Sequence, residues 1–314
     1  MKVIRAGTLG FCMGVRRAVE MAWRESSPGD GPEPAEGEGS LPGKQVYTLG
    51  PLIHNPGVLK SLEARGVKVL EEGSDFSLLA SDSASQNTTV IIRAHGVPPS
   101  VEKDLANAGL RVLDATCPHV KVSQLRARTF AEKGYVVFLA GEEHHAEIAG
   151  IRGFVSAASA AGVISPCHVV GSGQEAEKAA AELYSREPDA RTVLIGQTTI
   201  SPGEYRAIGE KIQRFFPDIE ILNTICACTA ERQEALRELC AKVDAVIIAG
   251  GRESANTRRL FSLAQELGKP AWLVENAAHI PPEIGSYKTV GLSAGASTPD
   301  TLVDEIEAIV SSKQ

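Results

Sequence analysis

The 314-residue sequence lacks the features of several large protein classes. No run approaches the roughly 18 consecutive apolar residues that a membrane-spanning helix requires, and residues 1–22 lack the apolar stretch of a signal peptide. There is no cluster of basic residues, and 32 Lys and Arg against 39 Asp and Glu give a net charge of −7. We therefore expect a cytoplasmic protein that neither enters a membrane nor takes nucleic acid as its main ligand.

Cysteine pairs of the C-x-x-C type are also missing, which argues against a zinc finger. A disulfide framework is not expected for six cysteines in a reducing compartment. Three of them, Cys12, Cys117 and Cys226, are almost evenly spaced, by 105 and 109 residues. Such spacing indicates an internal repeat.

The sequence around these three cysteines supports the repeat. Each stands between a short apolar run and a segment with apolar residues at helical spacing. Apolar runs with polar ends follow in each copy: QVYTL, YVVFLA and DAVIIA, then TVIIRA, TVLIG and TVGLSA, with the short runs VKVL, HVV and AWLV between them. Strands alternating with helices are typical of parallel sheets, so the fold class is α/β.

The repeat predicts three similar α/β units. Their ranges are 13–117, 118–223 and 224–314, the last completed by the N-terminal strand and loop 1–12. Residues 26–44 and 82–89 are rich in small and polar residues and are expected to be flexible insertions in the first unit. Any α/β chain can produce similar strand and helix pieces, but the cysteines and the polar strand ends agree with one another.

The ends of the strands are where chemistry is expected, because parallel sheets bind ligands beyond their carboxyl ends. If three units face one another around a pseudo-threefold axis, the cysteines and the polar ends share one central pocket. A cysteine at a helix N-terminus has a stabilised thiolate, the form that binds metal. Three thiolates suit either a zinc site or an iron–sulfur cluster with one open iron. Buried cysteines are also common in cores, and we interpret Cys167, Cys228 and Cys240 in that way.

The polar strand ends carry mainly neutral hydrogen-bonding groups and a single carboxylate. They comprise His54-Asn55, His95, His144 to Glu147, Thr198-Thr199, Ser254 to Asn256 and Ser297. Groups of this kind at strand-to-helix turns can hold a phosphate or diphosphate. Glu147 is the one group suited to deliver a proton. Each residue alone could equally be a helix cap or a satisfied core group, and only their placement beside the cysteines favours a site.

Several segments together resemble the 4-hydroxy-3-methylbut-2-enyl diphosphate reductases over essentially the whole chain. They are GFCMGVRRAVEMA, GPLIHNP, RAHGVP, DATCPHV, HAEIAG, GQTTIS, ICACTAERQEA, ESANTRRL and SAGASTPD. The resemblance implies a trefoil of three α/β units around a 4Fe-4S cluster held by Cys12, Cys117 and Cys226. It assigns the substrate diphosphate to His54, His95, His145, Ser254, Asn256 and Ser297.

The same resemblance implies an activity and its partners. The reaction is reductive dehydroxylation of (E)-4-hydroxy-3-methylbut-2-enyl diphosphate to isopentenyl and dimethylallyl diphosphate. Glu147 would relay protons, and Thr198 would contact the substrate hydroxyl. The electrons would come from a donor such as ferredoxin or flavodoxin.

The sequence departs from the family pattern at several positions. Ala255 replaces a serine, and Glu253 adds a negative charge beside an expected anion site. In the histidine loop, Ala146 replaces a proline between His145 and Glu147, and His144 is an additional histidine before them. Cys228 stands where a residue without a thiol is usual. These changes affect the expected affinity for the substrate and leave open whether His144 or His145 points inward. They remove neither a cluster ligand nor the proton donor Glu147.

Other functions are compatible with parts of the same pattern. A quinolinate-synthase-like 4Fe-4S dehydratase would share the three-cysteine trefoil but need no electron donor. A non-enzymatic iron–sulfur or zinc redox sensor would bind metal without turnover. Residues 171–176, GSGQEA, form a partial dinucleotide fingerprint, but the strand before them is too short and lies too late in its unit.

Overall fold

The computed structural model describes residues 1–26, 45–53, 55–71, 73–80, 87–159 and 166–313. His54 and most of the two expected insertions lie outside the described residues. The interpretation of 82–89 as an insertion is wrong at its end, because Thr88 and Thr89 are buried and open a strand. Threonine is polar but β-branched, so it occurs in strands as well as in polar loops. The composition of residues 82–89 alone therefore did not show where the insertion ends.

The described residues divide into two compact bodies, each described by itself. The smaller body comprises Met1–Trp23, Pro51–Arg65 and Ala227–Gln314, and the larger comprises Arg24–Gly50 and Gly66–Cys226. The strands are β1 (Lys2–Arg5), β2 (Gln45–Leu49), β3 (Val67–Leu70), β4 (Thr88–Ile92), β5 (Arg111–Asp114), β6 (Val136–Ala140), β7 (Cys167–Val170), β8 (Thr192–Gly196), β9 (Glu220–Ile221), β10 (Ala245–Ala249), β11 (Ala271–Val274) and β12 (Thr289–Ala294).

Helices follow almost every strand. They are α1 (Met13–Ser26), α2 (Pro56–Glu63), α3 (Ser77–Ala80), α4 (Pro99–Asn107), α5 (Pro118–Glu132), α6 (Ala146–Ser159), α7 (Gly173–Arg186), α8 (Pro202–Gln213), α9 (Ala227–Cys240), α10 (Ala255–Glu266), the 3₁₀ turns η2 (Ala277–His279) and η3 (Pro282–Ser286), and α11 (Asp300–Ser312). The predicted cysteine positions are confirmed locally, since Cys12, Cys117 and Cys226 each immediately precede a helix.

The strands form three sheets of identical topology. Sheet A has the order β1-β12-β10-β11, sheet B β5-β4-β2-β3 and sheet C β9-β8-β6-β7, and every pairing is parallel. Sheet A belongs to the smaller body, and sheets B and C belong to the larger. The predicted α/β class and the internal repeat are therefore confirmed, whereas the three domain boundaries stay a prediction.

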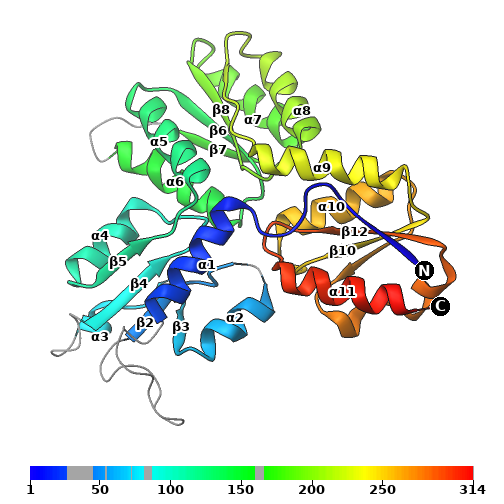
Figure 1. The fold of residues 1–314 in the computed structure, drawn as a ribbon. Helices are drawn as coiled ribbons and strands as arrows, with labels where there is room; N and C mark the ends of the chain where they lie inside the picture. Colours follow the sequence, from blue (N-terminus) through cyan, green and yellow to red (C-terminus); the bar gives the residue numbers. More distant parts are fainter. Residues whose placement is uncertain (27–44, 54, 72, 81–86, 160–165, 314) are drawn as a thin grey trace. The chain divides into compact units, whose positions relative to one another are not determined.

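Sheet C shows why the strands read as continuous apolar runs. Val136, Phe138 and Ala140 point into a core shared with helices α7 and α8. Val137 and Leu139, the alternate residues of the same strand, pack with residues of α5 and α6. The helices flank the sheet on both sides, as Figure 1 shows. A strand buried on both faces needs apolar residues at every position.

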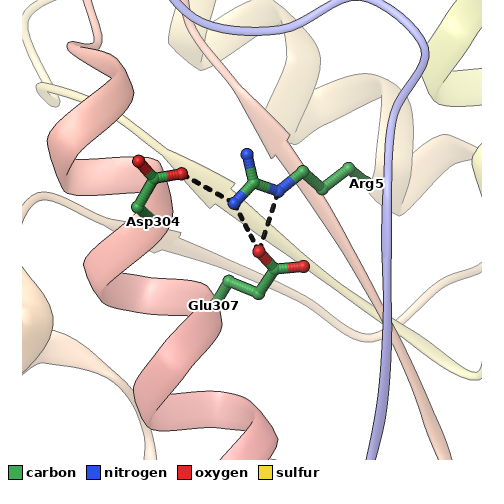
Figure 2. A network of polar contacts seen from close by, with 3 residues as sticks. All are labelled: Arg5, Asp304 and Glu307. Carbon is green, nitrogen blue, oxygen red and sulfur yellow. Dashed lines mark hydrogen bonds and ion pairs between the residues drawn. The ribbon is translucent and has the colours of Figure 1, made fainter.

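The N-terminal strand completes sheet A, as the repeat predicts. Residues 2–5 pair in register with residues 289–292 of β12. Arg5 extends this attachment by reaching helix α11, where its Nη2 donates to Asp304 Oδ1 at 2.7 Å and its Nε to Glu307 Oε2 at 2.9 Å (Figure 2). The beginning and the end of the described chain are thus joined within the smaller body.

Within the part of the chain that the structure describes, no helix combines the length and the apolar character needed to cross a bilayer.

Candidate functional site

The three predicted cysteine ligands are held by the same backbone device. In each case the cysteine N–H donates to the carbonyl of the second residue after a strand, and that strand pairs with the one that leads to the cysteine. The bonds are Cys12 N to Ala296 O at 3.1 Å, Cys117 N to Ala94 O at 2.9 Å and Cys226 N to Thr198 O at 2.9 Å. Each acceptor is a predicted substrate-contacting residue or the residue before one. The repeat therefore places one thiol beside one polar strand end three times, and all three thiols are partly buried.

Glu147 and Thr198 form a tightly bonded pair in the larger body. Thr198 N donates to Glu147 Oε1 at 2.6 Å, and Thr198 Oγ1 lies 2.9 Å from Oε2. Glu147 is only 1% exposed, so this carboxyl group is withdrawn from bulk water. The pair comes from the start of α6 and the end of β8, two positions 51 residues apart. A carboxyl group held against a hydroxyl in this way can exchange a proton through that hydroxyl.

The geometry distinguishes the two adjacent histidines. His144 is exposed, whereas His145 is partly buried and its Nδ1 accepts from Glu147 N at 3.2 Å. The His145 ring meets the His95 ring edge to face, with 5.2 Å between centroids. His145 is therefore the histidine that faces His95, and the extra His144 points to solvent.

The loop before Cys117 is fixed by a charged network. Asp114, at the end of β5, accepts from Thr116 N at 2.9 Å and lies 3.1 Å from Lys121 Nζ of α5. Burial acts to raise the pKa of Asp114, but hydrogen bonds from Thr116 and Lys121 outweigh it and hold the pKa below its ordinary value. Lys121 also bonds Glu102 at 2.9 Å, which ties α5 to α4.

The Ser254 turn of the smaller body contains buried polar groups without hydrogen-bond partners among the described residues. Ser254 caps α10 by accepting from Thr257 N at 3.3 Å, so its hydroxyl oxygen is partly used. Asn256 is 4% exposed, yet its Nδ2 has no hydrogen-bond partner among the described residues. Thr257 Oγ1 is likewise unpartnered there. Buried donors without partners are rare in proteins and point to a ligand or water at this turn.

The family departures near this turn have modest structural effects. Glu253 is exposed, and its backbone carbonyl accepts from Arg258 at 3.0 Å. Ala255 is buried at 4% exposure and presents only a methyl group.

Two further polar residues of the predicted strand ends lie elsewhere. Ser297 is partly buried and follows Ala296, which binds the Cys12 N–H. Asn55 is a helix cap whose Oδ1 accepts from Val58 N at 3.1 Å.

The remaining cysteines have no geometry that suggests ligation. Burial raises the pKa of Cys167 to about 12, so its thiol is protonated at neutral pH. Cys240 is 3% exposed within an apolar cluster, and burial raises its pKa as well. Cys228 is partly buried in the first turn of α9.

Sequence reasoning missed Gln197, which joins two strand ends of sheet C. Its Oε1 accepts from Glu142 N at 3.0 Å, and its Nε2 donates to Thr199 Oγ1 at 2.9 Å. A side-chain carbon on Gly141 would lie 2.7 Å from Gln197 Oε1, so a glycine is needed for this close approach. The position of Gln197 directly before Thr198 was the available signal.

A cavity of about 660 Å³ lies in the larger body at the carboxyl ends of β2 and β4. Its walls include Leu49, Phe76, Arg93, Val97 and Ala146. None of the predicted ligand or substrate residues lines it, although Gly96 and Ala146 adjoin His95, His145 and Glu147 in sequence.

The predicted cysteine ligands do not form a ready metal site within the described residues. No three His, Cys, Asp or Glu side chains among them form a group that could hold a metal ion. Cys12 belongs to the smaller body and Cys117 and Cys226 to the larger, so the three-thiol set is distributed over both. Each thiol nevertheless stands at a helix start with its backbone anchored, which is a suitable donor for iron.

These features define the protein as an α/β protein of three repeated parallel sheets, with a thiol and hydrogen-bonding groups at the carboxyl end of each. More specifically, the chain belongs to the LytB protein family, whose model matches residues 3–311.

Relatives of known name support this membership. The chain is 41% identical over 309 residues to a 4-hydroxy-3-methylbut-2-enyl diphosphate reductase of Treponema denticola, covering 98% of both proteins. It is 34% identical over 307 residues to the protein of the same name from Aquifex aeolicus, covering 98% of this chain and 94% of that one.

Solved structures agree. One structure of (E)-4-hydroxy-3-methyl-but-2-enyl diphosphate reductase, the terminal enzyme of the non-mevalonate pathway, is 34% identical with a TM-score of 0.66 and 99% coverage of both chains. The Plasmodium falciparum E-1-hydroxy-2-methyl-but-2-enyl-4-diphosphate reductase has a TM-score of 0.82 at 24% identity, covering 98% of this chain and 87% of that one, and so supports the fold.

Proposed function

We propose that this protein is an oxidoreductase that converts (E)-4-hydroxy-3-methylbut-2-enyl diphosphate to isopentenyl and dimethylallyl diphosphate. The observation that carries the proposal is the buried Glu147–Thr198 pair, in which Glu147 stands two residues after the His145 that packs on His95. A carboxyl group, a hydroxyl and two imidazoles in one place suit proton delivery to an alcohol that leaves as water. Membership of the LytB family supports the same reaction.

The proposed ligands of a 4Fe-4S cluster are Cys12, Cys117 and Cys226. When bound, such a cluster supplies single electrons and an open iron that acts as a Lewis acid. The chain's own contribution is to present three thiols from helix starts, where exposed backbone N–H groups stabilise the thiolate. The backbone anchors of the three cysteines limit how far each thiol can move.

The diphosphate is proposed to bind His54, His95, His145, Ser254, Asn256 and Ser297. Asn256 supports this assignment most directly, because its buried Nδ2 is a donor without an internal acceptor. A diphosphate oxygen would satisfy that donor.

Glu147 and Thr198 are proposed to manage the protons. Thr198 would contact the substrate hydroxyl through Oγ1 while its other hydrogen-bonding position faces Glu147 Oε2 at 2.9 Å. A proton can then move from the carboxyl group through the hydroxyl to the departing oxygen. Because a protonated hydroxyl leaves as water, this step lowers the barrier to breaking the C–O bond.

We extend the proposal to the organisation and partners of the chain. Residues 13–117, 118–223 and 224–314 with 1–12 would each form one α/β unit, with Cys117 at the end of the first unit and Cys12 and Cys226 in the third. The electrons would come from a small redox protein such as ferredoxin or flavodoxin. A dehydratase of the quinolinate synthase type would need no such donor.

Replacement of each proposed ligand by serine tests the cluster. Cys12→Ser, Cys117→Ser and Cys226→Ser should each lose most of their iron and sulfide after anaerobic purification, because a hydroxyl is a poor substitute for a thiolate. Cys167→Ala and Cys240→Ala are the matched controls and should keep the wild-type iron content. Turnover should require an electron donor; turnover without one would favour a dehydratase, and stable iron without turnover would favour a sensor.

A further inference from the structure

Arg232 of helix α9 is a buried cation whose role the proposed chemistry does not explain. The residue is 3% exposed. Nη2 donates to Gly10 O at 2.6 Å and Nη1 to Cys228 O at 2.9 Å, whereas Nε has no partner among the described residues. Both acceptors are neutral backbone carbonyls. Burying a charge is unfavourable unless an opposite charge lies near, and an arginine cannot escape by losing its proton.

The two carbonyls that Arg232 binds lie next to two proposed cluster ligands in the chain. Gly10 stands two residues before Cys12, and Cys228 stands two residues after Cys226. The guanidinium therefore fastens the loop that carries one thiol to the helical turn that follows another.

The loop itself has a backbone conformation that requires a glycine at position 10. Gly10 has a φ of +78°, and a side-chain carbon there would lie 2.8 Å from Asp300 Oδ1. The Cys12 N–H donates to Ala296 O. Arg232 at Gly10 O and Ala296 at Cys12 N thus hold the loop at two points that are two residues apart.

We infer that Arg232 positions the Cys12 loop and, through its buried charge, raises the reduction potential of the cluster. The inference rests on the proposed cluster ligation. Three thiolates give a 4Fe-4S cluster a net negative charge, and reduction adds one more electron. A fixed cation nearby stabilises the reduced form more than the oxidised form, because the net charge around a cluster sets its potential. The cluster in turn would supply an opposite charge for Arg232, whose hydrogen-bond acceptors among the described residues are two neutral carbonyls.

Arg232→Met, Arg232→Gln and Arg232→Lys separate the two effects, with Arg237→Met as the matched control. Arg237 lies on the same helix but is 46% exposed and pairs with Glu234 at 3.5 Å. For each anaerobically purified variant we would measure iron and sulfide per chain, the midpoint potential of the bound cluster by redox titration, and the thermal unfolding midpoint.

The expected results differ among the variants. Arg232→Met and Arg232→Gln should both shift the potential of the remaining cluster to more negative values. Arg232→Lys should keep the potential near that of wild type but bind less iron, because an ammonium group cannot reproduce the two-pronged geometry. Arg237→Met should change neither quantity.

Two outcomes would overturn the inference. An unchanged potential in Arg232→Gln and Arg232→Met, whether or not their unfolding midpoints fall, would remove the electrostatic role. Full iron content in Arg232→Lys would remove the positioning role. If the wild-type protein itself bound no iron, the proposed function would fail instead, and that result is distinct from either of these.

Discussion

The Glu147–Thr198 pair and the Ser254 turn are both buried strand ends of the same repeat, yet their hydrogen bonding differs. Glu147 accepts two hydrogen bonds from Thr198, so this pair has its geometry without any ligand. Asn256 at the Ser254 turn keeps a buried donor that nothing in the described protein satisfies. The first arrangement suits a group that must hold a proton in a fixed place, and the second suits a group that must receive a ligand.

The largest expected effect comes from Glu147→Gln. The glutamine oxygen can still accept from Thr198 N and its amide can donate to Thr198 Oγ1, so the shape of the pair survives. Only the exchangeable proton is lost, and turnover per cluster should fall by about 10²–10⁴-fold with substrate still bound. Steady-state rates with a one-electron chemical reductant, normalised to iron content, measure this.

Glu143→Gln is the control for that comparison. Glu143 lies on the same turn but is exposed and pairs with Arg152 at 3.3 Å. Its replacement should leave the rate unchanged. A Glu147→Gln rate close to that of wild type would contradict the proton role and direct attention to His145 or Thr198.

The second-largest expected effect is at Asn256, where a substitution should change substrate binding but not the stability of the fold. Asn256→Ala should weaken substrate binding by about 1–3 kcal/mol, the usual value of a hydrogen bond to a charged group. It should not lower the free energy of unfolding, because the donor that it removes has no hydrogen-bond partner among the residues that the structure describes. The KM and the denaturation midpoint of one preparation provide both values.

Asn55→Ala is the matched variant for stability. Asn55 is as buried as Asn256, but its Oδ1 caps α2, and loss of such a cap costs about 1 kcal/mol. If Asn256→Ala destabilised the protein as much as Asn55→Ala, the Ser254 turn would not be an open donor set.

The smallest expected effect is the loss of stability on replacing Asp114, in the loop before Cys117. Asp114 has a lowered pKa, so its contribution to stability is present above the unfolded value of 3.8 and is lost as pH falls through the lower folded value. Asp114→Asn should therefore be less stable at neutral pH, and the difference should narrow in acid. The size should stay below about 1 kcal/mol, because the side chain is 39% exposed and solvent screens its pair with Lys121.

Unfolding midpoints measured at neutral pH and below pH 3.8 test this, with the exposed Asp104→Asn as control. A stability gap that widened in acid would mean that Asp114 does not hold the loop as a carboxylate.

The repeat could be predicted from sequence because the central strands of each copy are buried on both faces. Such strands appear in the sequence as continuous apolar runs. The placement of Cys12 and Cys117 before helices followed from the same patterns. Arg232 could not be found in this way, because a single charged residue inside a helical pattern normally faces solvent. The choice between His144 and His145 depended on a ring contact with His95, which lies 50 residues away and leaves no local signal.

The backbone bonds of the cysteines have a consequence for how such a protein can change during evolution. Cys117 is bonded to the residue before His95, Cys226 to Thr198 itself, and Cys12 to the residue before Ser297. An inserted or deleted residue in any of these loops would displace a proposed iron ligand and a proposed substrate contact together. Substitutions at the two members of a pair should therefore be strongly non-additive, and the metal site and the substrate site are expected to diversify as one unit.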